Sequence, residues 1–427
     1  MTKSRAMRIV VWGINYWPEV AGIAPFNRGM CRFLAGRGHQ VRMVSTFSYY
    51  PAWRKDAEDR FRIFRTDLVD GIPVHRCWHF VPARATTLRR IVHELSFGIT
   101  SFLRILSLPR ADIYIVVSPP LILGPLAWAA CMLKRSRYVF HVQDLQPDAA
   151  VGLGMMKARG FMARILHRMA GRTYRNAVLV SGISSSMIDA FAEKRVPAEK
   201  RYWFPNWIEG GQSERRTTET ADWRARYGIP DEAFLASYSG NLGRKQGLDV
   251  LLDAAEMLAT QEIVADTNDP NRYWPIVFVI AGDGVMRPEL EARLKRRPLP
   301  NLRLLPLLSE ADYQAMLSSA NACLITQAKG TGRFFLPSKL LSALVAGRAV
   351  VAVADETSEL ARAVREGNFG VVVQPEDPGA VAGALSDLAA HPAKLVEFGL
   401  NGRRWVAQFD AATVLGKFEE RLREVAC

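Results

Sequence analysis

The chain has 427 residues, of which 49% are hydrophobic and 23% are charged. This composition excludes an intrinsically disordered chain, and the length suits two domains of about 200 residues each. The five cysteines are far apart and form no Cys-x-x-Cys pair, which argues against a disulfide framework or a zinc ribbon and favours a reducing compartment. The net charge of +14 predicts attraction to polyanions, whether nucleic acid, anionic lipid headgroups or phosphorylated substrates.

In chain order, the first half alternates short β-branched runs with helical segments. A helix is expected over 26–36, and strands are expected at 8–12, 41–46, 112–117, 138–141 and 177–181. Fully apolar strands that alternate with helices indicate a parallel sheet with both faces covered. The longest apolar run, Pro119–Leu133, is interrupted by Pro125 and falls short of the roughly 20 residues of a membrane span, so it predicts a buried helix.

The segment Arg84–Arg110 predicts a basic amphipathic helix. Its apolar stripe and the arginines beside it comprise Leu88, Ile91, Val92, Leu95, Ile99, Phe102, Leu103 and Leu106, with Arg84, Arg89, Arg90, Arg104 and Arg110. Such a helix can lie in a membrane interface, and an ordinary domain helix shows the same stripe. Both interpretations remain open, and the charge favours the membrane surface slightly.

Residues 207–231 are polar and rich in turn-forming residues, which predicts a linker. The alternation then restarts, with a loop insertion at 261–275 and strands expected at 234–239, 276–281, 302–306, 322–326, 349–353 and 370–373. The sequence therefore predicts an α/β protein of two doubly wound domains, residues 1–206 and 232–410, with a final helix in 411–427 that can pack back on the first. Ligands of such sheets bind beyond the carboxyl ends of the strands, so we expect the site in a cleft between the domains.

The strongest local signal is the glycine-rich segment Ser239–Gly247, between a predicted strand and a predicted helix. Gly240 and Gly243 let the backbone approach a ligand, and the free N–H groups of the helix suit an anion. Arg244 and Lys245 add positive charge where a diphosphate would lie. The alternative is a tight turn with two solvated basic residues.

A second signal is Leu336–Gly347, which precedes the predicted strand at 349–353. Pro337 and Ser338 are typical of a helix start, which would aim Ser338, Lys339 and several N–H groups into the same cleft. The alternative is an ordinary capped helix. Two helix starts that point at one cleft favour an anion site.

A third signal is His141–Asp148, which follows a predicted strand of the first domain. His141 with Asp144 could orient or deprotonate a substrate hydroxyl. The alternative is a structural histidine. The loop after the first strand, with Glu19 and Gly22, is expected to face the same cleft.

Taken together, these motifs resemble family 4 glycosyltransferases, and within that family the colanic acid-type exopolysaccharide transferases. The resemblance covers nearly the whole chain. The matching segments, in one order, are Gly13–Glu19, Ser118–Pro120, His141–Asp148, Ser184–Met187, Pro205–Trp207, Gly240–Gly243, Ala281–Gly284 and Pro337–Lys339.

The resemblance implies a GT-B fold of two Rossmann-like domains and a nucleotide diphosphate sugar as co-substrate. It also implies retention of anomeric configuration without a metal ion or another cofactor. Carried over by position, the donor-binding residues would be Gly240, Asn241, Gly243, Arg244, Lys245, Ser338, Lys339 and Ser342.

On the acceptor side, the resemblance implies contacts from Glu19, Gly22 and Asp148, beside His141 and Asp144 as the catalytic pair. The implied acceptor is a lipid-diphosphate-linked saccharide. We therefore expect a cytoplasmic protein that is peripheral at the anionic inner face of the cell membrane. Nucleic acid is not an expected partner, because the basic residues are dispersed rather than interleaved with aromatic residues.

Metal-binding patterns are weak. The sequence has no Asp-x-Asp, which argues against a diphosphate bridged by a metal ion as in single-domain transferases. His75, Cys77 and His79 alternate along a predicted strand at a spacing that could hold a metal, and ordinary strand residues explain the pattern better. The sequence also has no Gly-x-Ser-x-Gly elbow, which argues against a hydrolase.

The sequence departs from the family pattern at three positions. The wider family has two glutamates where this chain has Phe334 and Ser342, and the second glutamate usually holds the donor ribose. Asn241 stands where many relatives carry arginine. Two alternatives therefore stay open: a non-catalytic, membrane-associated scaffold on a transferase fold, and a sugar-nucleotide epimerase.

Overall fold

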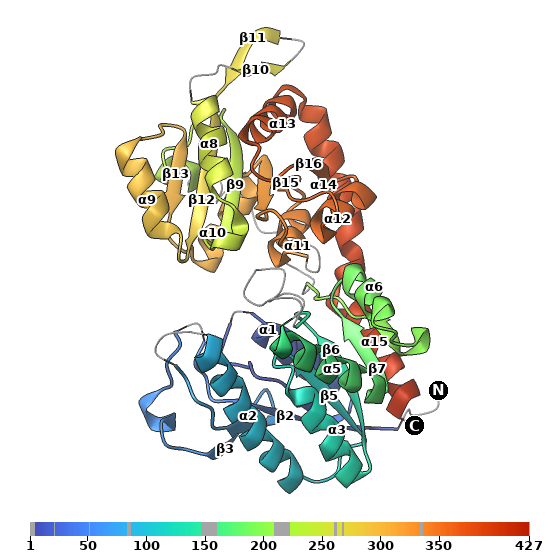
Figure 1. Ribbon diagram of the computed structural model, residues 1–427. Coiled ribbons are helices and arrows are strands. Elements are labelled where there is room, and N and C mark those ends of the chain that lie inside the picture. The colour runs from blue at the N-terminus through green and yellow to red at the C-terminus, as the bar shows by residue number, and fades with distance from the viewer. Residues whose placement is uncertain are drawn as a thin grey trace. The chain divides into compact units, whose positions relative to one another are not determined.

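The computed structural model describes residues 5–20, 22–50, 52–82, 87–146, 160–208, 223–259, 263–266, 269–332 and 336–426. The chain forms two compact units, one made of residues 1–207 with 412–427 and the other of residues 208–411. Each unit is built on its own parallel sheet (Figure 1). Of the predicted linker, residues 209–222 lie outside the described residues, whereas Trp223 and Ile229 are buried in the core of the second unit.

The first unit contains an eight-stranded sheet with the order β3-β4-β2-β1-β5-β6-β7-β8. Both faces of the central strands are covered, and every residue of β5 is therefore buried. β3 is an antiparallel edge strand that pairs with β4. The strands are β1 (Arg8–Trp12), β2 (Gln40–Thr46), β3 (Phe64–Val69), β4 (Ile72–Cys77), β5 (Ile113–Ser118), β6 (Arg137–Val142), β7 (Leu179–Gly182) and β8 (Arg201–Trp203).

Helices connect these parallel strands. The first helix begins two residues before the predicted start, with Pro25 in its first turn, where the missing N–H costs no hydrogen bond. The helices of this unit are α1 (Ala24–Gly36), α2 (Thr87–Ser107), α3 (Leu123–Lys134), α5 (Phe161–Asn176), α6 (Ser185–Glu193) and, from the far end of the chain, α15 (Ala411–Ala426).

The second unit contains a six-stranded parallel sheet with the order β13-β12-β9-β14-β15-β16. All six strands match runs predicted from the sequence. They are β9 (Phe234–Asn241), β12 (Ile276–Asp283), β13 (Leu302–Leu305), β14 (Ala322–Thr326), β15 (Ala349–Val353) and β16 (Gly370–Val373). The helices are α8 (Asp249–Leu258), α9 (Arg287–Arg296), α10 (Glu310–Ser319), α11 (Ser338–Val345), α12 (Glu359–Gly367), α13 (Pro378–Ala390) and α14 (Pro392–Val406).

The prediction of a loop insertion at 261–275 is wrong in part. The segment forms an antiparallel hairpin of β10 (Ile263–Asp266) and β11 (Asp269–Trp274). Backbone hydrogen bonds between the two strands give this segment a regular structure, which its polar composition did not predict.

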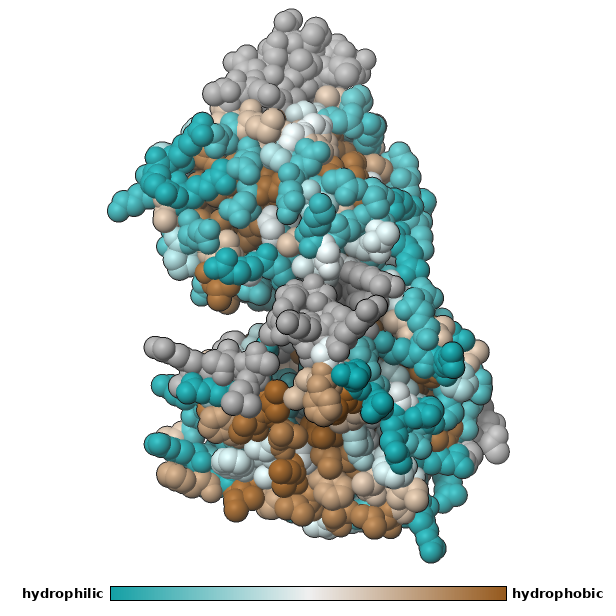
Figure 2. Space-filling view, viewed as in Figure 1, coloured by the Kyte–Doolittle hydropathy of each residue, from teal (hydrophilic) through white to brown (hydrophobic). Residues whose placement is uncertain are grey.

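Two helices of the first unit expose apolar residues. The predicted buried helix is α3, which is only half-buried: its C-terminal residues Met132 and Leu133 are 66% and 68% exposed. The apolar stripe of α2 also faces outward, with Ile99 and Leu103 at 60% and 54% exposure, whereas Phe97 and Ile105 point into the core. The predicted stripe is therefore largely exposed, while α2 also packs on the sheet as a domain helix does, so both interpretations stay predictions. Figure 2 shows hydrophobic residues gathered over α2 and α3.

Within the described residues, no helix is both long enough and apolar enough to cross a bilayer.

Candidate active site

Glycines bring two strand ends of the second sheet very close together. Gly240 at the end of β9 has a φ of +125°, and Gly282 on the neighbouring β12 has a φ of +150°. A Cβ atom at Gly282 would lie 1.9 Å from the carbonyl oxygen of Gly240. Both positions therefore require glycine, which leaves the backbone accessible at the carboxyl edge of the sheet.

The glycine-rich loop after β9 is fixed by backbone contacts. It contains a short 3-10 turn, η4 (Arg244–Gln246), followed by Gly247 with a φ of +59°. The carbonyl oxygen of Lys245 accepts a hydrogen bond from the N–H of Ala328 at 2.8 Å, which ties the loop to the segment after β14. The side chains of Arg244 and Lys245 are exposed, so the loop presents two basic groups beside the carboxyl edge.

Lys339 places a shielded cation next to Gly240. It is the second residue of α11, whose first turn has no side-chain cap. Its Nζ atom lies 3.7 Å from the centre of the Tyr238 ring and 3.7 Å from the position that a Cβ atom at Gly240 would take. The side chain as a whole is half-buried, but Nζ itself is shielded from solvent and has no hydrogen-bond partner among the described residues.

The environment of Lys339 destabilises its charged form. Burial lowers the pKa of Lys339 to about 7, and the positive charge of Lys245 adds to this effect. An anion placed between these two cations would relieve both the desolvation and the like-charge repulsion. The arrangement therefore has the electrostatic character of an anion site.

Ser342 lies one turn further along α11, near the hydroxyl of Tyr313. Burial raises the pKa of Tyr313, and hydrogen bonding to Ser342 and to Ser239 partly offsets that rise. These three side chains link α10, α11 and the end of β9.

Asn241 and the two other glycines complete this region. The carbonyl oxygen of Asn241 accepts a hydrogen bond from the Tyr238 hydroxyl at 2.9 Å. A Cβ atom at Gly243 would lie 3.0 Å from the Asn241 Nδ2 atom, and one at Gly284 would lie 2.6 Å from Oδ1. The structure thus brings the predicted donor-binding residues to one edge of the second sheet, while their role in donor binding stays a prediction.

In the first unit, His141 is the second-last residue of β6, and both of its ring nitrogens have hydrogen-bond partners. Its Nδ1 atom lies 3.0 Å from the hydroxyl of Ser181, and its Nε2 atom lies 2.9 Å from the side-chain nitrogen of Gln143. Because an amide nitrogen only donates, Nε2 accepts and the ring carries its proton on Nδ1. Burial lowers the pKa of His141 to about 3, so the ring is neutral near pH 7. A substrate hydroxyl can reach Nε2 only by displacing Gln143.

Hydrogen bonds to Glu19 join two loops at the carboxyl edge of the first sheet. Its carboxylate accepts hydrogen bonds from the N–H groups of Tyr49 and Tyr50 at 2.9 and 3.0 Å and from the amide of Asn15 at 2.7 Å. Burial still raises its pKa. Gly22, with a φ of +65°, has open space on its Cβ side.

The predicted catalytic partner Asp144 is exposed, two residues before Gln146. Burial raises the pKa of Glu94 on α2 to about 6, while Arg90 and a hydrogen bond to Gln146 lower it. The negative charge of Asp144 adds to the rise. Asp148 and Phe334 lie outside the described residues. The catalytic and acceptor roles stay predictions, as does the common cleft.

Sequence reasoning missed several residues that shape these regions. Tyr238 supplies the ring beneath Lys339, and Tyr313 holds Ser342. Gln143 joins His141 to Asn206, because its side-chain nitrogen also donates to the Asn206 Oδ1 atom at 2.9 Å. The position of Tyr238, two residues before Gly240, was a signal that could have identified it. Nothing in the sequence near Tyr313 indicates its contact with Ser342.

No group of three or more potential metal ligands occurs in the part of the chain that the structure describes. His75 instead contacts the hydroxyl of Thr66 and the guanidinium of Arg104, each at 3.0 Å. His75 thus has partners within the protein, and the interpretation of the three alternating residues as ordinary strand residues stays a prediction.

Comparisons with known proteins agree with this architecture. A family model described as a glycosyl transferase 4-like domain matches residues 21–207, and one described as glycosyl transferases group 1 matches residues 233–391. The chain is 32% identical over 386 residues to the putative colanic acid biosynthesis glycosyl transferase WcaI of Escherichia coli K12, covering 89% of this chain and 91% of that protein. The chain belongs to the family 4 glycosyltransferases.

Solved structures share the fold of this glycosyltransferase. HepE of Anabaena in complex with UDP-glucose has a TM-score of 0.68 and 16% identity, covering 98% of this chain and 100% of that chain. Sucrose-phosphate synthase of Thermosynechococcus elongatus has a TM-score of 0.71 and 16% identity, covering 98% and 99%. The two Rossmann-like sheets are those of a GT-B glycosyltransferase, so the predicted family and fold class are confirmed.

Proposed function

We propose that this glycosyltransferase moves a sugar, with retention of configuration and without a metal ion, from a nucleotide diphosphate sugar to a lipid-diphosphate-linked saccharide in exopolysaccharide assembly. The observation that carries the proposal is the shielded ammonium of Lys339, which has no hydrogen-bond partner among the described residues and lies over Tyr238 beside Gly240. A diphosphate would supply the missing acceptor oxygens and the opposite charge.

The donor assignment is supported by the second unit as a whole. An uncapped helix start, a glycine-lined edge and three basic side chains lie together, which is the chemistry that binds a diphosphate. A protein of the same fold, HepE, is solved in complex with UDP-glucose. We place the diphosphate against Lys339, Arg244 and Lys245, and the ribose near Ser342.

In the proposed reaction, the bond between sugar C1 and the diphosphate oxygen breaks while the acceptor oxygen bonds to C1 on the same face. The departing phosphate oxygen takes the proton of the acceptor hydroxyl. Lys339, Arg244, Lys245 and the first N–H groups of α11 stabilise the charge that develops on the diphosphate. His141, which is neutral, and Asp144 orient the acceptor, and Glu19, Gly22 and Asp148 are the further residues that the family resemblance assigns to it.

The exposed stripe of α2 supports a location at the membrane surface. Ile91, Val92, Leu95, Ile99 and Leu103 are all exposed, and Arg89, Arg90 and Arg104 lie on the same helix. Apolar residues at a bilayer boundary, with cations at the level of anionic headgroups, stabilise surface binding. We place the protein in the cytoplasm, peripheral at the inner face of the membrane, where a lipid-linked acceptor is within reach.

Calorimetry with UDP, GDP and ADP tests the donor site. Lys339→Met keeps the length of the side chain and removes its charge, and we expect it to weaken binding of the preferred nucleotide by about 1.5–3 kcal/mol, the usual contribution of a hydrogen bond to a charged group. Lys295→Met, on exposed α9, is the matched control and should bind like the parent. Equal affinity of the Lys339 variant and the parent would remove Lys339 from the proposed site.

Two other functions remain as outcomes of the same experiment, since Ser342 stands where the family usually has a glutamate. A non-catalytic scaffold would bind none of the nucleotides. A sugar-nucleotide epimerase would bind one of them and convert its sugar without an acceptor. Acceptor-dependent release of the nucleoside diphosphate distinguishes the transferase from both.

A further inference from the structure

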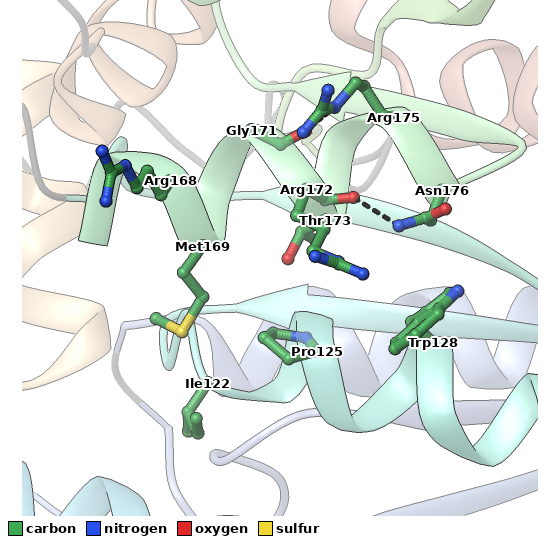
Figure 3. Close-up of a pocket in the computed structure, with 10 residues that line it drawn as sticks. All are labelled: Ile122, Pro125, Trp128, Arg168, Met169, Gly171, Arg172, Thr173, Arg175 and Asn176. Atoms are coloured by element: carbon green, nitrogen blue, oxygen red, sulfur yellow. Dashed lines mark hydrogen bonds between the residues drawn. The ribbon is translucent and has the colours of Figure 1, made fainter. Parts of the chain in front are cut away.

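A groove lies between α3 and α5 of the first unit, and none of the residues assigned to the candidate active site lines it. Its volume is about 660 Å³, within the range of roughly 300–1,000 Å³ that is typical of small-molecule pockets. Figure 3 shows the two helices on opposite sides of the groove, with the lining residues Ile122, Pro125, Trp128, Arg168, Met169, Gly171, Arg172, Thr173, Arg175 and Asn176.

Small residues create the groove. A Cβ atom at Gly124 would lie 2.3 Å from the Thr173 side chain, so α3 and α5 touch there because Gly124 has none. At Gly171, two residues before Thr173 and on the side of α5 away from α3 (Figure 3), no atom lies within 4 Å of a Cβ position, so this glycine borders open space outside the contact between the helices. Thr173 is 1% exposed, and its hydroxyl has no hydrogen-bond partner among the described residues. The hydroxyl is closed off by this contact, and the groove beside it, lined by Ile122, Pro125, Trp128 and Met169, suits a mainly apolar ligand.

Arginines line the rim. Arg168, Arg172 and Arg175 are exposed, and the guanidinium of Arg172 lies 5.4 Å from the centre of the Trp128 ring. In the described part of the chain, neither Arg168 nor Arg172 forms an ion pair with a carboxylate. Helices α2, α3 and α5 together carry eight Lys or Arg residues and one acidic residue, Glu94. The rim therefore selects for a negatively charged ligand group.

Exposed apolar side chains surround the groove on the same three helices. α3 packs against both α2 and α5, so their outer surfaces adjoin. The exposed apolar residues are Ile91, Val92, Leu95, Ile99 and Leu103 on α2, Met132 and Leu133 on α3, and Phe161, Met162 and Ile165 on α5. Monomeric soluble proteins rarely expose an apolar surface of this kind without a partner for it.

We propose that the groove between α3 and α5 binds an acyl chain of an anionic phospholipid, with the lipid phosphate on Arg168 and Arg172. The apolar walls accept the chain, and the surrounding apolar residues enter the bilayer boundary. The pairing of an apolar groove with a cationic rim matches an amphiphile that carries a negative charge at one end. This lipid site is independent of nucleotide binding, so its test does not depend on the proposed function.

Vesicle flotation of the full chain tests the charge component. Vesicles of phosphatidylcholine with about one third phosphatidylglycerol should bind the protein, and vesicles of phosphatidylcholine alone should bind it much more weakly. The double substitution Arg168→Gln/Arg172→Gln should lower the partition coefficient roughly 20- to 30-fold, since each basic residue at an anionic surface contributes about fivefold.

The matched control is Lys295→Gln/Arg296→Gln, which removes the same charge from exposed positions of α9. We expect it to change partition less than about twofold. If the control pair lowers binding as much as the arginine pair, binding follows net charge alone and the site is overturned.

Filling the groove tests the acyl-chain component. Met169→Trp enlarges an apolar side chain that points from α5 toward α3 in the groove (Figure 3), and circular dichroism will show that the fold is retained. We expect this variant to lose binding of dihexanoyl phosphatidylglycerol below its micelle concentration at least tenfold, while glycerol phosphate binds the parent weakly or not at all.

Three results would contradict the proposal. Parent-like binding of the short-chain lipid by the Met169→Trp variant would show that the chain does not enter the groove. Equal affinity for glycerol phosphate and for the lipid would reduce the site to a phosphate site. A dimer in sedimentation without lipid that Met169→Trp dissociates would make a second copy of the chain the occupant.

Discussion

Lys339 and His141 both have titratable atoms that are shielded from solvent, but their surroundings differ. Both ring nitrogens of His141 have protein partners, so burial is compensated and the ring is held neutral. The Nζ atom of Lys339 lies over the face of Tyr238 and has no hydrogen-bond partner among the described residues, and Lys245 repels its charge. His141 therefore has the bonding of a positioning residue, whereas Lys339 lacks the partner that an anionic ligand would provide.

Nucleotide affinity should depend on pH through Lys339. Its pKa of about 7 means that it is cationic below pH 7 and neutral above. A diphosphate prefers the cation, so we expect affinity for the preferred nucleotide to fall between about pH 6.5 and pH 8.5, with proton uptake on binding in the upper part of this range. Calorimetry in buffers of different ionisation enthalpy measures the uptake. Lys339→Met should abolish it, and uptake that persists in this variant would assign it to another group.

Truncation of His141 should affect stability. His141→Ala leaves the buried Ser181 hydroxyl and the Gln143 amide without their partner and opens space beside Phe204, whose ring centre lies 4.8 Å from that of His141. We expect the free energy of unfolding to fall by about 2–4 kcal/mol in urea. His391→Ala, at a half-exposed position, serves as the control and should cost less than about 1 kcal/mol. A loss below 1 kcal/mol at His141 would contradict the structural part of its role.

At the scale of elements, the carboxyl edge of the second sheet owes its form to glycine contacts between neighbouring strands. β9 and β12 pair in register from Phe234 with Ile276 to Asn241 with Asp283, so Gly240 lies directly opposite Gly282. This register brings the glycine-rich loop and the segment Ala281–Gly284 together. Neither strand alone would reveal why both glycines are required.

Gly282→Ala tests this contact. The added Cβ atom would lie 1.9 Å from the Gly240 carbonyl oxygen and cannot be accommodated without moving the end of β9. We expect a loss of stability of about 1–3 kcal/mol and weaker nucleotide binding. Gly383→Ala, on α13 where a Cβ atom meets no neighbour, should leave binding unchanged and stabilise the helix by up to about 1 kcal/mol. Calorimetry and thermal melting report both quantities, and parent-like behaviour of Gly282→Ala would contradict the packing argument.

At the scale of the whole molecule, the last helix belongs to the first unit although it ends the chain. Phe418 of α15 stacks on Phe204, with ring centres 3.9 Å apart. Glu419, which is 2% exposed, accepts hydrogen bonds from Arg37 at 2.9 Å and from Arg423 at 2.5 Å, and lies 3.1 Å from His39 Nε2. The first unit is therefore complete only when the end of the chain has folded onto it.

Glu419→Gln should destabilise the first unit selectively. Burial raises the pKa of Glu419, but hydrogen bonds from Arg423, His39 and Arg37 outweigh it, so the folded-state pKa lies below the ordinary 4.5. The stabilisation is thus present above about pH 4.5 and is lost as the pH falls through the folded-state value. We expect a cost of about 2 kcal/mol at pH 7, less than for a fully buried pair because Arg37 is exposed.

Hydrogen exchange measures this effect by region. Exchange should accelerate in β1 and β2 and stay unchanged in β12, whereas the exposed control Glu420→Gln should alter neither. Equal acceleration in both units would show that α15 does not act on the first unit alone.

The sequence by itself determined the two parallel sheets, the family and the glycine-rich and Ser338–Lys339 motifs. Fully buried strands such as Ile113–Ser118 are apolar at every position, and helix starts such as Pro337-Ser338 carry local chemistry, so both leave a signal in a short stretch of residues.

Only the tertiary structure decided what depends on contacts between distant segments. It placed Lys339 over Tyr238, bonded both nitrogens of His141, and turned the stripe of α2 outward. The spacing of apolar residues shows that a helix has an apolar face, but not whether that face meets the core. In α2 the core contact is made by other residues, Phe97 and Ile105. The groove between α3 and α5 likewise exists only because Gly124 and Thr173, far apart in sequence, touch.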